Sequence, residues 1–86
     1  MNSGTQAPTE QISRHEAQIL SELAGEEEIV SFEEMQALEE PLKVRLAAIQ
    51  SVIARGLAYP LSPALTPEGH LALDQFRRTE GMRHAV

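Results

Sequence analysis

Helix starts are the clearest signal in this sequence. The pattern Ser-x-x-Glu occurs at Ser13 with Glu16 and again at Ser31 with Glu34. In such a capping box, each side chain accepts a hydrogen bond from the backbone N–H of the other residue, which satisfies two donors that a helix start leaves unpaired. Apolar residues flank both boxes where they can pack on each other. Two helices are therefore predicted to begin at these positions.

The residues after each start set the predicted lengths of these helices. Apolar residues recur at helical spacing up to Gly25, a natural left-handed terminator, which predicts a first helix over 14–24. The β-branched pair at 29–30 predicts one short strand or bridge. A short second helix is predicted between Ser31 and Pro41. Its apolar face consists of Phe32, Met35 and Leu38.

A third helix is predicted over 41–55, before Gly56. Pro41 suits its first turn, where the missing N–H has no helical partner. At about 100° per residue, four apolar residues form a stripe about 60° wide, which is predicted to face the core. They are Leu42, Leu46, Ile49 and Ile53. The opposite face is small and weakly polar, and is predicted to point outward; it carries Val44, Ala47, Ala48, Ser51 and Arg55.

The segment over 57–65 predicts two very short extended pieces around a proline-bearing turn. Because proline donates no ladder hydrogen bond, any hairpin here is expected to be small and to lie at a sheet edge. Thr66 followed by Pro67 and Glu68 predicts the start of a fourth helix, with threonine as its N-cap. Gly81 is predicted to end that helix.

A chain of 86 residues has room for one small domain. We predict a disordered tail over 1–11, a folded domain over 12–81 and a frayed end over 82–86. No apolar run approaches the roughly 20 residues that span a bilayer, and no signal-peptide pattern opens the chain. These features predict no membrane partner and a cytoplasmic location. The absence of cysteine excludes disulfides and thiolate metal sites.

Charge is divided unevenly along the chain. Residues 1–40 contain ten acids and one base, whereas residues 41–86 contain six bases and three acids. Such an asymmetry predicts a polarised surface whose two sides prefer different partners. The formal net charge of −6 argues against coating DNA or an anionic membrane by bulk charge alone.

The predicted order is helix, short strand, helix, helix, two strands, helix (α-β-α-α-β-β-α), which is that of a winged helix-turn-helix domain. The segment 31–35 followed by 41–57 resembles the helix-turn-helix of the MarR-type regulators. In those proteins the wing leaves a helix through Gly-Leu and returns through Leu-Thr-Pro-Glu-Gly, and Gly56-Leu57 and the segment 65–69 are similar to these borders. The resemblance covers about 12–78. It implies a mainly α fold with a small β-hairpin, in a truncated version with a short wing.

This resemblance implies a transcription regulator whose third helix enters the major groove of duplex DNA. Transferred by position, the candidates facing bases are Lys43, Val44, Ala47, Gln50 and Ser51, and those facing phosphates are Arg45 and Arg55. The alternative is an acidic winged-helix module, or an anti-regulator, that binds a regulatory protein through the small apolar face of the same helix. A homodimer is possible under either interpretation.

No enzyme activity, cofactor or metal site is predicted. His70 and Asp74 stand four residues apart on one helix, but nothing nearby completes a tetrahedral set of ligands. Neither a nucleophile elbow nor a glycine-rich phosphate loop is present.

Overall fold

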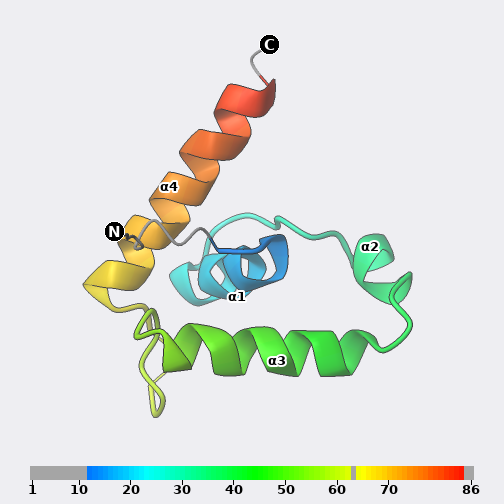
Figure 1. The fold of residues 1–86 in the computed structure, drawn as a ribbon, viewed down its shortest axis with the longest axis horizontal. Helices are drawn as coiled ribbons and strands as arrows, with labels where there is room; N and C mark the ends of the chain where they lie inside the picture. The colour runs from blue at the N-terminus through cyan, green and yellow to red at the C-terminus, as the bar shows by residue number, and fades with distance from the viewer. Residues whose placement is uncertain (1–11, 63, 85–86) are drawn as a thin grey trace, which may run out of the picture.

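The protein is built from helices, of which α1 (Arg14–Ala24) packs on α3 (Pro41–Ala54) and on α4 (Pro67–His84). The computed structural model describes residues 12–62 and 64–84. In Figure 1, α1 and α4 lie on one side of α3, and the loop after α3 extends toward its other side. The helices of the described residues are α1 (Arg14–Ala24), α2 (Phe32–Gln36), α3 (Pro41–Ala54) and α4 (Pro67–His84).

Both predicted capping boxes are confirmed. The Ser13 hydroxyl accepts the Glu16 N–H at 3.1 Å, and the Glu16 carboxylate accepts the Ser13 N–H at 2.8 Å. The same exchange joins Ser31 and Glu34 at 3.0 and 3.2 Å. At the other end of α1, Gly25 takes the left-handed conformation with φ 71°. These local signals therefore place α1 where the sequence predicts it.

The core lies where α1, α3 and the first turns of α4 meet. α1 and α3 form the largest contact between elements, and α4 packs on α1. Leu20 of α1 and Val52 of α3 are fully buried. The buried apolar residues of this cluster are Ile12, Ala17, Ile19, Leu20, Ala48, Val52, Leu57, Ala58, Leu65 and Leu73.

The predicted winged-helix fold with its small β-hairpin is wrong. The described residues contain no β-strand; between α3 and α4 there is one isolated antiparallel bridge, from Ala58 to Leu65. A backbone hydrogen bond of 3.1 Å from Tyr59 N to the Ala64 carbonyl lies beside it. Proline at position 60 supplies no donor, and the segment is too short to extend the ladder. The predicted strand at 29–30 is a bend instead.

The start of α4 matches the prediction, but its end does not. The Thr66 hydroxyl accepts the Gly69 N–H at 3.0 Å and donates to the Gly56 carbonyl at 2.6 Å, so it caps α4 and ties it to the end of α3. Gly81 does not terminate the helix, which continues to His84. A glycine inside a helix costs only about 1 kcal/mol, which neighbouring residues can offset. The predicted tail over 1–11 and residues 85–86 lie outside the described residues.

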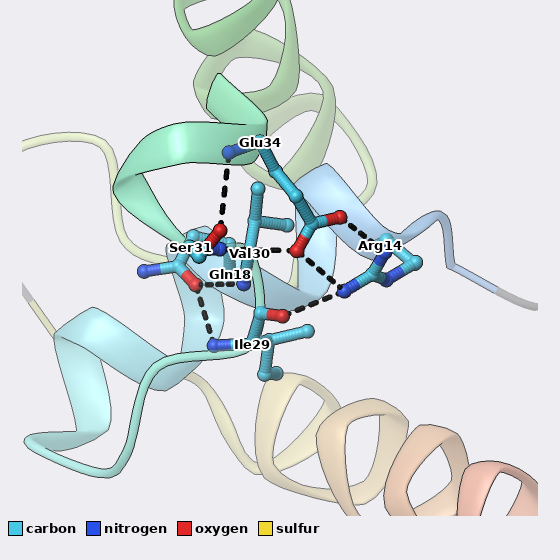
Figure 2. A network of polar contacts seen from close by, with 6 residues as sticks. All are labelled: Arg14, Gln18, Ile29, Val30, Ser31 and Glu34. Carbon is cyan, nitrogen blue, oxygen red and sulfur yellow. Dashed lines mark hydrogen bonds and ion pairs between the residues drawn. The ribbon is translucent and has the colours of Figure 1, made fainter. Parts of the chain in front are cut away.

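A buried glutamine holds the link between α1 and α2 in place (Figure 2). The Gln18 side-chain carbonyl accepts the backbone N–H groups of Ile29 and Val30 at 2.7 and 2.8 Å. Its amide group donates to the Glu22 carboxylate at 2.7 Å. From the other side, Arg14 donates to the Ile29 carbonyl at 2.7 Å. The bend at 29–30 thus depends on side-chain partners rather than on a neighbouring strand.

Replacing Gln18 by alanine is expected to lower the free energy of unfolding by about 1–3 kcal/mol, because the buried Val30 N–H is left without an acceptor. Urea unfolding followed by circular dichroism measures this change. Gln50→Ala on α3 is the matched control; Gln50 is exposed, and its loss should change stability by less than about 0.5 kcal/mol. Equal effects of the two substitutions would contradict the assigned role of Gln18.

Candidate interaction surface

α3 is rotated relative to the prediction. Leu42 and Leu46, predicted to lie in the core, are 82% and 54% exposed. Ala48, predicted to point outward, and Val52, which the predicted core stripe omits, are buried against α1. The prediction is therefore wrong for the first half of the stripe. Ile49 and Ile53, in its second half, pack against the edge of the core.

Polar side chains of α3 outside the predicted core stripe explain this rotation. Arg55 donates to both carboxylate oxygens of Glu16 at 3.1 Å, and the Ser51 hydroxyl donates to the same carboxylate. Near the middle of α3, Arg45 forms a two-point ion pair with Glu22 at 2.5 and 2.9 Å. These three side chains direct one face of α3 toward α1, with Ala48 and Val52 between them. The apolar stripe then has to face another direction.

Glu16 is the central acid of this contact and is only 8% exposed. Burial acts to raise its pKa, but hydrogen bonds from Ser51, the Ser13 N–H and Arg55 outweigh burial, so the pKa of Glu16 is lowered. Glu16 thus has two roles. It completes the capping box of α1, and it binds the side chains of Ser51 and Arg55 at the end of α3.

The ion pair between Arg45 and Glu22 lies nearer the surface. The hydrogen bond from Arg45 lowers the pKa of Glu22, against a smaller opposing effect of burial. The same bond raises the pKa of Arg45. Both groups are therefore held in their charged forms.

Part of the charge asymmetry of the sequence is used in ion pairs within the fold. Three arginines of the basic half pair with glutamates of the acidic half: Arg55 with Glu16, Arg45 with Glu22, and Arg77 with Glu26. These ion pairs between the acidic and the basic half therefore stabilise the fold, and the three arginines are not grouped on one basic surface.

The structure divides the candidate DNA-binding residues between positions that contact α1 and positions that are exposed. Arg45 and Arg55 bind acids of α1, and Ser51 binds the same acid as Arg55. Val44 is half-buried. The exposed candidates are Lys43, Ala47 and Gln50, and the Lys43 ammonium lies 3.7 Å from the Glu40 carboxylate.

An apolar groove runs beside the C-terminal half of α3. It has a volume of about 350 Å³ and lies between α1, α3 and the loop after α3. The ion pair of Arg45 with Glu22 forms part of its rim. Leu61, at the loop, is 98% exposed. The apolar side chains that line the groove include Ile19, Leu23, Ile49, Ile53, Tyr59 and Leu61.

The groove and the stripe form one surface. On a helical wheel, Leu42 and Leu46 lie within about 60° of Ile49 and Ile53, which line the groove. We call Leu42, Leu46, Ile49 and Ile53 the α3 stripe. The helical spacing of its residues makes the stripe recognisable in the sequence. The loop has no periodic pattern, so the sequence does not predict that Tyr59 and Leu61 lie beside the stripe.

No chemical centre accompanies this surface in the part of the chain that the structure describes. Over residues 12–62 and 64–84, no three histidine, aspartate or glutamate side chains cluster closely enough to hold a metal ion. His70 is exposed, and Asp74 pairs with Arg78 at 2.9 Å. Within the same residues, no helix combines the length and apolar character needed to cross a bilayer.

Comparison of the chain with protein-family models, with curated proteins and with solved structures gives no match in any of the three. The resemblance to the MarR-type regulators therefore stays a prediction, and functional inference rests on the surface itself.

Proposed function

We propose that the protein is a protein-interaction module that binds the apolar face of a helix from another protein molecule. The observation that carries this proposal is the exposure of Leu42 and Leu46 on the same stripe of α3 whose Ile49 and Ile53 line the groove. Exposed apolar residues that are grouped on one face of a monomer are typical of interaction surfaces. Side chains at helical spacing beside a groove suit a docked amphipathic helix.

The arrangement of charge favours a protein partner over DNA. Binding to DNA gains most of its affinity from cations that neutralise phosphates. Arg45 and Arg55 are already neutralised by Glu22 and Glu16, so using them on DNA would require breaking these ion pairs. Among the side chains that the structure describes, four of the six large exposed apolar ones lie on the stripe or beside the groove, which suits a partner that buries apolar area.

The chain itself supplies a reporter for this surface. Tyr59 is the single tyrosine, the chain has no tryptophan, and Tyr59 lines the groove. A synthetic helical peptide with leucines along one face and lysines elsewhere is expected to protect Tyr59 fluorescence from quenching by acrylamide. A peptide of equal composition with scattered leucines is the control, because it carries the same charge.

Two variants make this test specific. Leu46→Glu is expected to weaken protection of Tyr59 by the peptide at least tenfold, since it puts a charge on the stripe. Leu71→Glu makes the same change at an exposed leucine on α4, which does not line the groove, and should leave binding unaltered. Equal binding of both peptides, or no binding, would contradict the proposal. Salt-sensitive binding of duplex DNA that is lost in Lys43→Ala would favour the DNA-reading alternative instead.

A further inference from the structure

We propose that a second cavity, between the α1–α2 link and α4, binds an arginine side chain of a partner protein. This cavity, which we call the α4 cavity, has a volume of about 520 Å³ and is lined by residues other than those of the groove. Arg14 of α1 lies at it, and the link and α4 supply its other lining residues: Glu27, Glu28, Ile29, Phe76, Arg77 and Glu80. Three observations carry the inference: the apolar base of the cavity, the pairing of its arginines and the charge at its edge.

Two apolar side chains form the base of the α4 cavity. Ile29 of the link and Phe76 of α4 are half-buried and pack against the core, so they lie on its inner side. The face of an aromatic ring attracts a cation, and apolar surface around it gains from contact with the methylene groups of a long side chain. A base of this kind favours a cation on an apolar stem over a bare metal ion.

The two arginines of the cavity are already paired. Arg14 donates to the Glu34 carboxylate at 2.7 and 3.3 Å and to the Ile29 carbonyl at 2.7 Å (Figure 2). Arg77 forms an ion pair with Glu26. An anion would have to displace these carboxylates before it could bind either guanidinium. The arginines therefore do not make the cavity an anion site.

The charge left at the edge of the cavity is negative. Glu27 and Glu28 are exposed, and within the described residues neither carboxylate takes part in an ion pair or a hydrogen bond. The basic side chains that the structure describes away from the cavity are paired with other acids; they are Lys43, Arg45, Arg55 and Arg78. The two glutamates thus leave negative charge that a cation from outside the chain can neutralise.

A guanidinium fits an apolar, aromatic base beside two carboxylates. It is planar, so it can stack on the ring of Phe76 while its N–H groups donate to Glu27 and Glu28 at the edge. An ammonium is compact and more strongly hydrated, and it stacks less well. Free arginine carries its own α-carboxylate, which the acidic edge repels. An arginine within a protein chain is therefore the ligand that the cavity suits best.

Titration with small molecules, followed by two-dimensional NMR of the full chain, tests the proposal. N-acetyl-arginine N-methylamide is expected to shift the amide signals of Glu28, Ile29 and Phe76, with a dissociation constant of roughly 1–10 mM. The citrulline analogue has nearly the same shape but no charge, and should bind at least about tenfold more weakly. Equal shifts by the two molecules, or no shifts by either, would overturn the proposal.

Two further molecules test the identity of the ligand. N-acetyl-lysine N-methylamide carries the same charge without the planar group, and is expected to bind at least about threefold more weakly than the arginine compound. Equal binding would overturn the choice of arginine. Free arginine is also expected to bind more weakly, and tighter binding of free arginine would overturn the assignment to a partner protein.

Paired substitutions show whether the charge acts at the cavity. Glu27→Gln together with Glu28→Gln is expected to weaken binding of the arginine compound at least about fivefold. Glu33→Gln together with Glu39→Gln removes the same charge from two exposed glutamates that do not line the cavity, and should change binding by less than about twofold. Equal weakening in the two variants would overturn the proposal, because the overall charge of the chain would then attract the cation.

The inference is independent of the proposed function, since the α4 cavity contains no residue of the α3 stripe. Leu46→Glu should therefore bind the arginine compound as the wild type does. A chain that binds the leucine–lysine peptide beside Tyr59 but does not bind the arginine compound would overturn this inference alone. A chain that binds the arginine compound but not the peptide would overturn only the proposed function.

Discussion

Gly69→Ala is expected to destabilise the folded chain strongly. A methyl group at this position would lie 1.9 Å from the Leu57 carbonyl oxygen and 2.9 Å from its carbon, and both are backbone atoms. The same oxygen accepts the Thr66 N–H at 3.1 Å, so it cannot move away without loss of that bond. The cost is expected to be about 4 kcal/mol or more, against a total stability of about 4–13 kcal/mol for a chain of this length. Far-UV circular dichroism during thermal unfolding measures it.

The same substitution at Gly25 supplies the control. Gly25 has open space around it but takes φ 71°, so alanine there brings conformational strain without a clash. We expect Gly25→Ala to fold and to lose about 1 kcal/mol. If Gly69→Ala is as stable as Gly25→Ala, the close approach of α4 to the end of α3 is wrong.

Helix positions could be predicted from this sequence because the signals are local. Each capping box involves residues three apart, and Gly25 ends α1 through its own backbone conformation. Such motifs act before any tertiary contact forms, so the sequence alone carries them. Gly81 shows the limit of this reasoning: the residue type permits a helix end but does not require one.

The buried face of α3 could not be predicted in the same way. The helix has two neighbouring apolar faces, and periodicity does not tell which of them packs inward. The choice depends on Glu16, which lies 35 residues before Ser51 and 39 before Arg55. Pairing over such distances depends on the tertiary structure. The smaller Ala48 and Val52, which allow α1 to approach closely, take the buried position that the sequence predicts for Leu42 and Leu46.

The candidate site expected from the sequence differs from the accessible surface in the structure for the same reason. The sequence predicts α3 as the functional helix and names its charged residues as the contacts. In the structure, two of those charges hold α3 on α1, and Leu42 and Leu46 of the stripe predicted as core are exposed. Periodicity therefore grouped these four residues on one face, but it assigned Leu42 and Leu46 to the wrong environment.

Glu16→Gln is expected to lower the free energy of unfolding by about 2 kcal/mol at neutral pH. The amide keeps the size of the side chain but removes the charge that Arg55 and Ser51 bind. Arg55 is then left with an uncharged partner in a contact that is mostly shielded from water. Glu33→Gln, which changes an exposed glutamate of α2 in the same way, should alter stability by less than about 0.5 kcal/mol.

The dependence on pH distinguishes loss of the Glu16 charge from a loss of packing. Because the pKa of Glu16 is lower in the folded chain than its ordinary value of about 4.3, its charged form stabilises the fold above that value. This stabilisation is lost as the pH falls through the lowered pKa. Between about pH 5 and pH 3, the urea midpoint of the wild type should therefore fall more steeply than that of Glu16→Gln, and the two should converge in acid. A difference that stays constant down to pH 3 would contradict an ionic role for Glu16 and assign the loss to packing alone.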